Sequence, residues 1–177
     1  SNTKQTFEDA KIATKLIFDN IEKVYVNGKD VEARENMLVG SFHAGLAFTR
    51  AYVGYVHAIA HNLGGMYGIP HGLANAVILP YVLDYFGETA YKRLAELADV
   101  AGISGPAQGD REKAKRFIAA IRELNAKMNI PTGFEQIKDE DIPLIAERAL
   151  KEGNPLYPVP KIMNQADCEA LIKSLKL

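Results

Sequence analysis

Three of the four histidines fall within fifteen residues, in the segment VHAIAHNLGGMYGIPHG (56–72). His57 and His61 are four residues apart, so on a helix their side chains leave the same face, one turn from each other. His71 follows a glycine-rich turn, which lets the chain fold back and bring a third imidazole to that helix. Imidazole nitrogens bind iron and zinc, so the pattern indicates a metal site with room for a carboxylate and a substrate oxygen.

A structural interpretation of the same histidines stays open on residue chemistry alone. A lone histidine on an apolar helix is usually a hydrogen-bonded core residue, and a pair at this spacing is often not a pair of ligands. Ala58 stands where zinc proteases carry their catalytic glutamate, which excludes that hydrolytic chemistry. His43 shares none of the spacing, and we expect it to be structural or at most to support a ligand.

Glycine and proline divide the chain into helical segments, and no stretch alternates polar and apolar residues as a strand would. Apolar spacing predicts a first helix from Phe7 to about Tyr25, with Thr6 as its start signal and Asn27-Gly28 as its stop. A second helix is predicted from about Asp30 to Tyr52. Because the run 37–65 is apolar on nearly every side, we expect it to be buried at the centre of a bundle.

The rest of the chain also indicates helices. One is expected to begin at Pro70 and to bend at Pro80. Asp110 is a candidate cap, and residues 102–109 and 153–160 are expected to be loops. Amphipathic helices are predicted over 89–101, 111–128, 141–151 and 165–174. The fold class is therefore all-α, a multi-helix bundle.

Composition narrows the possible partners. The 177 residues, 47% of them hydrophobic, suit one globular domain, and 21 basic against 22 acidic residues give a net charge of −1. No basic patch for nucleic acid or an anionic membrane is expected. Without a signal peptide or a membrane-spanning run, and with one cysteine, we expect a cytoplasmic protein in which Cys168 is a passive helix residue.

A longer pattern contains the histidines. The segment VHAIAHNLGGMYGIPHGLANAVILPYVLDY closely resembles the signature of the iron-containing (group III) alcohol dehydrogenases. The resemblance extends to GKDVEARENMLVGSFHAGLAF ahead of it, and to LAELADVAG, IRELNAKMNIPTGF, DEDIPLIAERAL and NPLYPVP after it. It thus covers nearly the whole chain. Asn62 departs from the proline of many members, which implies only a small local change.

The resemblance implies a fold and a role for each histidine. Residues 1–177 would be the helical, metal-binding C-terminal domain of the dehydroquinate synthase-like/iron alcohol dehydrogenase superfamily. His57 and His71 would be metal ligands for Fe²⁺ or Zn²⁺. His61 would lie beside the nicotinamide of NAD or NADP and the substrate, and would serve catalysis rather than the metal.

The remaining ligands in that family, an aspartate and a histidine, belong to an Asp-Ala-x-x-His motif that this sequence lacks. Asp9-Ala10 echoes it, but position 13 is Ala13 and Asp9 aligns better with the helix that follows the motif. The chain begins with Ser1-Asn2 and not with methionine, which suggests a removed tag or a piece of a longer protein. We therefore expect a fragment that lacks the N-terminal nucleotide-binding domain and is inactive alone.

The implied function is NAD(P)-linked hydride transfer between a small alcohol and an aldehyde or ketone. Phe48, Tyr52, Val53 and Tyr67 could line the substrate pocket, although bundle core explains each of them as well. A homo-oligomer is expected. The alternatives are a glycerol dehydrogenase or dehydroquinate synthase-like relative, and a helical metal-binding or interaction module without catalysis.

Overall fold

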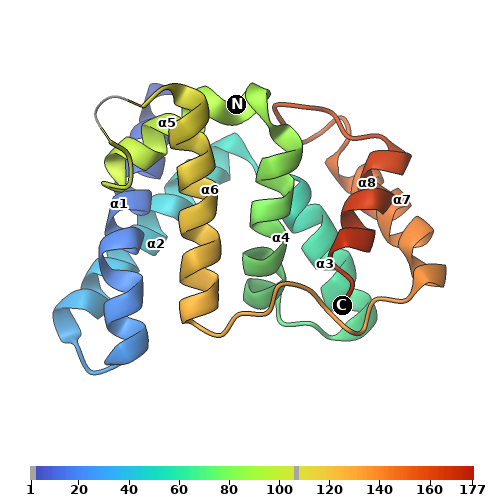
Figure 1. Ribbon diagram of the computed structural model, residues 1–177, viewed down its shortest axis with the longest axis horizontal. Coiled ribbons are helices and arrows are strands. Elements are labelled where there is room, and N and C mark those ends of the chain that lie inside the picture. The colour runs from blue at the N-terminus through green and yellow to red at the C-terminus, as the bar shows by residue number, and fades with distance from the viewer. Residues whose placement is uncertain (1–2, 106–107) are drawn as a thin grey trace. The chain divides into compact units, whose positions relative to one another are not determined.

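The computed structural model describes residues 3–105 and 108–177, and its described part is built from α-helices (Figure 1). The all-α prediction is confirmed. Ser1-Asn2 and, in the predicted 102–109 loop, Pro106 and Ala107 lie outside the described residues. The elements are α1 (Lys4–Val26), α2 (Val31–Ala51), α3 (Tyr55–Tyr67), α4 (His71–Phe86), α5 (Glu88–Val100), α6 (Asp110–Lys127), the 3-10 turn η1 (Asp139–Asp141), α7 (Ile142–Gly153) and α8 (Gln165–Ser174).

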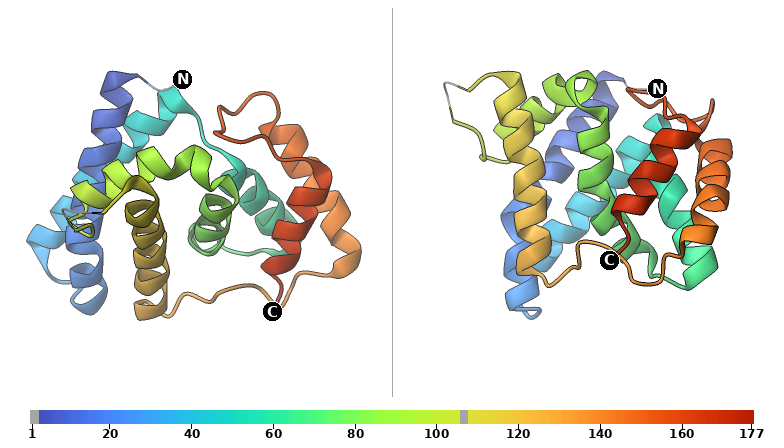
Figure 2. Two further views of the ribbon diagram at one scale, coloured as in Figure 1. Left: turned by 45° about the horizontal axis from the view of Figure 1, so that its top comes forward. Right: turned by 45° about the vertical axis from the view of Figure 1, so that its right-hand side comes forward.

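The chain divides into two compact units, one of residues up to 52 together with 90–120, the other of residues 53–89 together with 121–177. In the first unit α1 and α2 run side by side (Figures 1 and 2). Gly40 permits this close packing, since a Cβ there would lie 3.3 Å from the side chains of Leu16 and Ile17. Phe18 of α1 also contacts Phe117 of α6, with ring centroids 5.3 Å apart.

Helix α1 begins three residues before the predicted start. Thr3 caps it, because its hydroxyl accepts from the backbone N–H of Thr6 while the Thr6 hydroxyl accepts from the N–H of Thr3. This reciprocal pair satisfies two donors that the first helical turn leaves free. Thr6 is therefore part of the cap and lies inside the helix.

The expectation that the whole run 37–65 is buried is wrong for its first half. The run breaks at Tyr52, whose φ of 64° ends α2, and Gly54 caps the next helix. Leu38 and Phe42 of α2 are 71% and 63% exposed, whereas Leu63 of α3 is fully buried. Apolar content alone does not show which of two consecutive helices a core will cover.

A hydrogen bond between a buried aspartate and a histidine joins α1 to α2. Asp9 of α1 is 4% exposed, and its Oδ1 lies 2.9 Å from Nδ1 of His43 on α2. That contact is the main cause that lowers the pKa of Asp9, with Gln5 donating to Oδ2 as a smaller one. The expected structural role of His43 thus has a physical basis.

The second unit has its core between α3, α4, α7 and α8. Helices α3 and α7 pack on each other, as do α7 and α8 (Figures 1 and 2). Tyr55 at the start of α3 is fully buried; its hydroxyl donates to Oδ1 of Asn154 at 2.6 Å and accepts from the backbone N–H of Met163 at 3.0 Å. This tyrosine ties α3 to the segment that follows α7.

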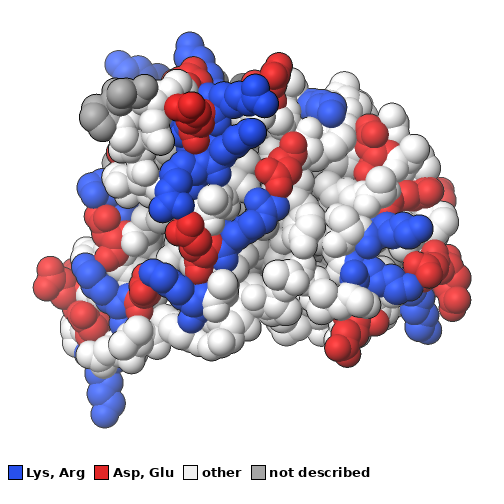
Figure 3. All heavy atoms as spheres, in the orientation of Figure 1, with Lys and Arg blue, Asp and Glu red and all other residues white. Residues whose placement is uncertain are grey.

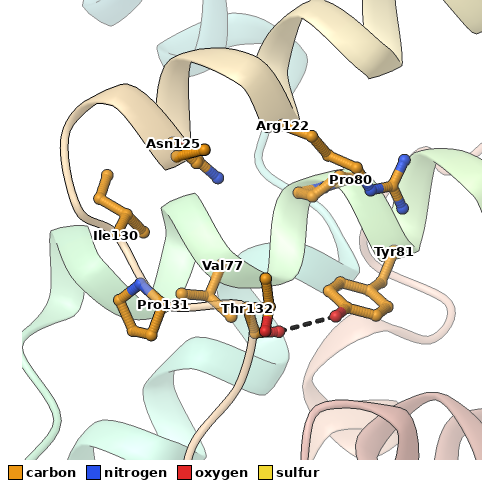
Figure 4. Close-up of a pocket in the computed structure, with 9 residues that line it drawn as sticks. Val77, Pro80, Tyr81, Arg122, Asn125, Ile130, Pro131 and Thr132 are labelled. Carbon is orange, nitrogen blue, oxygen red and sulfur yellow. Dashed lines mark hydrogen bonds between the residues drawn. The ribbon is translucent and has the colours of Figure 1, made fainter.

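Pro80 lies inside α4, as predicted, and a neighbouring helix compensates for it. A proline has no N–H, so the carbonyl of Ala76 loses its usual helical donor. Nδ2 of Asn125, on α6, donates to that carbonyl at 2.8 Å. Asn125 and Pro80 both line a pocket of about 90 Å³ (Figure 4), where the Tyr81 hydroxyl donates to the carbonyl of Thr132 at 2.7 Å.

We expect Asn125→Ala to lower the free energy of unfolding by about 1–3 kcal/mol, because it leaves a helix carbonyl without its donor. In a Pro80→Ala background the new N–H at position 80 can donate to Ala76, so the same substitution should cost about 1 kcal/mol less. Urea denaturation of the four proteins measures this. Additive effects would show that the amide does not replace the lost helical bond.

We expect the Asp9–His43 pair to stabilise the fold less at acid pH. The pKa of Asp9 is lowered in the folded state, so its contribution is present above the ordinary aspartate pKa of about 3.9 and disappears as the pH falls through the lower folded value. Asp9→Asn should therefore flatten the loss of stability below about pH 4, measured by urea denaturation across pH. Asp19→Asn, which alters an exposed carboxyl of α1, should not flatten it.

Candidate functional site

The fold brings the three predicted histidines together in the second unit. His57 and His61 lie on α3 with ring centroids 6.0 Å apart, and His71 is the first residue of α4. The His71 centroid is 5.4 Å from each of the others, and its ring is nearly parallel to that of His61, at 15°. The glycine-rich turn therefore returns the chain to α3, as the spacing predicts.

The turn between α3 and α4 has a clear local cause. Gly68 takes the left-handed conformation, with φ of 69°, and its N–H donates to the carbonyl of Gly64 at 3.0 Å, which closes α3. Ile69 follows and is 6% exposed, which anchors the turn in the core. Pro70 then caps α4, so His71 starts the new helix within reach of the old one.

The three imidazoles differ in environment. His57 is half-buried, whereas His61 and His71 are exposed. Burial lowers the pKa of His57, the neighbouring His71 and His61 lower it further, and Glu152 opposes them. A lowered pKa keeps this ring neutral near pH 7, and the neutral ring is the form that binds metal.

His61 contacts a carboxylate that lies 91 residues further along the chain. Its Nδ1 is 2.8 Å from Oε1 of Glu152, at the end of α7, and the hydroxyl of Tyr157 donates to the same oxygen at 2.8 Å. The pKa of Tyr157 is raised by burial and then by this hydrogen bond. The sequence reasoning missed both residues, because no local pattern connects them to a histidine so distant.

His71 is held by its own helix. Nδ2 of Asn75, one turn on, donates to the backbone carbonyl of His71 at 2.8 Å and lies 3.1 Å from its Nε2. The other amide atom, Oδ1 of Asn75, is buried and has no hydrogen-bond partner among the described residues. This orphaned acceptor next to His71 is a polar group that the protein side chains alone do not satisfy.

A divalent metal fits the pair His57 and His71. Two imidazoles that share one ion through bonds of about 2 Å have ring centroids about 5 Å apart, close to the observed 5.4 Å. Within the described residues, no three His, Cys, Asp or Glu side chains form a group able to hold an ion. The assignment of His57 and His71 as metal ligands therefore stays a prediction.

The other residues singled out from the sequence lie in several places. Phe48 and Tyr52 line a groove of about 440 Å³ in the first unit, between α1 and α2 and near Arg93. Tyr67 of α3 donates its hydroxyl to Asp141 at 2.7 Å, so it is tied to η1. Cys168 is fully buried, and burial raises the pKa of its thiol to about 12, which makes it a passive core residue.

Comparison with known proteins identifies the family. The sequence model described as the Fe-containing alcohol dehydrogenase family, C-terminal, matches residues 5–176. The chain belongs to this family. The histidine cluster and its turn are therefore features of an iron-type alcohol dehydrogenase domain.

Curated relatives of this family member are longer than it is. It is 38% identical over 163 residues to a 1,3-propanediol dehydrogenase of Klebsiella pneumoniae, covering 91% of this chain and 42% of that protein. It is 35% identical over 164 residues to the NAD-dependent methanol dehydrogenase of Bacillus methanolicus, covering 92% and 43%. The chain thus spans less than half the length of these relatives.

A solved structure has the same fold. The crystal structure of a 1,3-propanediol oxidoreductase superposes with a TM-score of 0.92 at 36% identity, covering 98% of this chain and 46% of that one. None of the helices in the described part of the chain combines the length and the hydropathy that a membrane span requires. Figure 3 shows basic and acidic side chains interspersed on one face of this family member.

Proposed function

We propose that this chain is the metal-binding domain of an NAD(P)-linked alcohol dehydrogenase that interconverts a small alcohol and its aldehyde or ketone. One observation carries the proposal. In a member of the Fe-containing alcohol dehydrogenase family, the ring centroids of His57 and His71 are 5.4 Å apart, and His61 lies next to both rings. The relatives named for 1,3-propanediol and methanol support a short-chain alcohol as the substrate.

In this proposal His57 and His71 hold a divalent ion, with Fe²⁺ favoured over Zn²⁺ by the family's description. The bound metal would act as a Lewis acid on the alcohol oxygen, and NAD or NADP would accept the hydride. The remaining ligands and the nucleotide site would belong to other parts of the intact protein. The chain alone would then reduce aldehydes little or not at all with either cofactor.

His61 moves the proton in this scheme. Oxidation of an alcohol releases a hydride and a proton, and the proton needs an acceptor close to the oxygen. His61 is exposed, stacks on His71 and lies one turn from His57, so it can take that proton and pass it to solvent.

We expect His57→Ala and His71→Ala to abolish tight metal binding in the intact protein. Each removes one imidazole from a site that this chain supplies only in part. The measurement is the amount of iron and of zinc bound per protein molecule after purification without air. The control is His43→Gln, which removes an imidazole from the other unit and should leave the metal content unchanged. Circular dichroism checks that each variant is folded. Full metal content in either alanine variant would contradict the ligand assignment.

We expect His61→Ala to lower the rate of alcohol oxidation in the intact protein by about 10²–10⁴-fold while metal content stays the same. The reason is that proton transfer loses its acceptor, while the proposed ligands remain. Steady-state kinetics with 1,3-propanediol or methanol and each cofactor, measured across pH, tests this. An unchanged rate with an unchanged pH profile would refute the proton-transfer role of His61.

A further inference from the structure

A hydrogen-bonded chain runs from Tyr157 through Glu152 to His61, and the proposed function uses only its last member. The Tyr157 hydroxyl and Nδ1 of His61 both lie 2.8 Å from one carboxylate oxygen, Oε1 of Glu152. An ionised carboxylate can only accept hydrogen bonds. The nitrogen that faces Glu152 must therefore carry the proton.

We propose that Glu152, held by Tyr157, is a positioning residue that fixes His61 in its Nδ1–H tautomer and sets the orientation of its ring. In this neutral form Nε2 has a lone pair and can accept a proton. The carboxylate at Nδ1 then faces the positive charge that His61 gains when it accepts one. A carboxylate behind a catalytic imidazole plays this part in serine hydrolases.

The backbone on either side supports the position of Glu152. Gly153, the next residue, packs on Tyr55 so closely that a Cβ there would lie 2.9 Å from the tyrosine ring. Oδ1 of Asn154 accepts a hydrogen bond from the Tyr55 hydroxyl at 2.6 Å. Tyr55 and His61 are both on α3, so the end of α7 is fastened to the helix that carries the histidine.

Stability does not explain the His61–Glu152 pair. The His61 side chain is 45% exposed and that of Glu152 30%, and at this exposure even a fully charged pair contributes little to folding. The second hydrogen bond, from Tyr157, restrains the carboxylate further: this tyrosine packs against the core of the unit, and its backbone N–H donates to the carbonyl of Gly153 at 2.8 Å. Two donors on one oxygen define the direction of the acceptor, which is what tautomer selection requires.

The direct test is to determine the tautomer of His61 in this chain. Long-range ¹H–¹⁵N spectra of the chain with ¹⁵N-labelled histidine rings report it. They are recorded at about pH 8.5, where ordinary imidazoles are neutral. The His61 signals are assigned by their loss in His61→Gln. We expect the Nδ1–H form in the unaltered chain and a shift toward Nε2–H in Glu152→Ala. Tyr157→Phe, which keeps the ring, should give a smaller shift in the same direction.

Glu147→Ala is the matched control, because it removes the same charge from the exposed face of the same helix, α7. It should leave the tautomer of His61 unchanged. The inference is wrong if the unaltered chain shows the Nε2–H form, or if Glu152→Ala changes the His61 tautomer no more than Glu147→Ala does. Because the spectra need neither metal nor cofactor, this result does not depend on activity.

The kinetic consequence rests on the proposed function. In the intact protein we expect Glu152→Ala to lower kcat for the alcohol about 10–100-fold with KM nearly unchanged, the size typical of residues that orient a functional histidine. Glu147→Ala should change neither constant. If the tautomer shifts but the intact protein oxidises no alcohol, the proposed function fails and the positioning of His61 stands. If Glu152→Ala does not shift the tautomer of His61, the proposed positioning role of Glu152 is wrong, whatever the activity of the intact protein.

Discussion

The packing of α3 is the constraint on which the rest of the site depends. One face of this helix carries Ala58, Ile59 and Leu63, all fully buried, and the histidines leave the other face. Burial of the apolar face fixes the rotation of the helix about its axis. His57 and His61 therefore leave α3 on the side opposite the core, and the contact with Glu152 orients the ring of His61.

The start of α4 and the end of α7 are both positioned by their contacts with α3. The turn at Gly68 and Ile69 returns the chain so that His71 begins α4 beside the first two imidazoles. The end of α7 is fastened to Tyr55, which brings Glu152 to His61. A site assembled from three elements is thus held at both ends of one buried helix, and its geometry follows from core packing.

The two units differ in how far their large apolar side chains are buried. In the second, apolar side chains fill the core between α3, α4, α7 and α8. In the first, α2 exposes several large ones, and the groove lined by Phe48 and Tyr52 is apolar. Large exposed apolar surfaces usually mark contact with another chain segment or molecule.

The sequence by itself determined the helices, the family and the closeness of the three histidines, because all three rest on local information: apolar spacing, glycine and proline at the turn, and a long contiguous signature. It could not determine which helix is buried, since one apolar run, residues 37–65, covers the second half of α2 and most of α3, and only the packing of distant segments separates them. Nor could it find Glu152, Tyr157 or the Asn125 amide that replaces the helical donor lost at Pro80. The contacts of Glu152 with His61 and of Asn125 with Ala76 join residues far apart in the chain, and only the tertiary structure decides which of the many polar side chains meet.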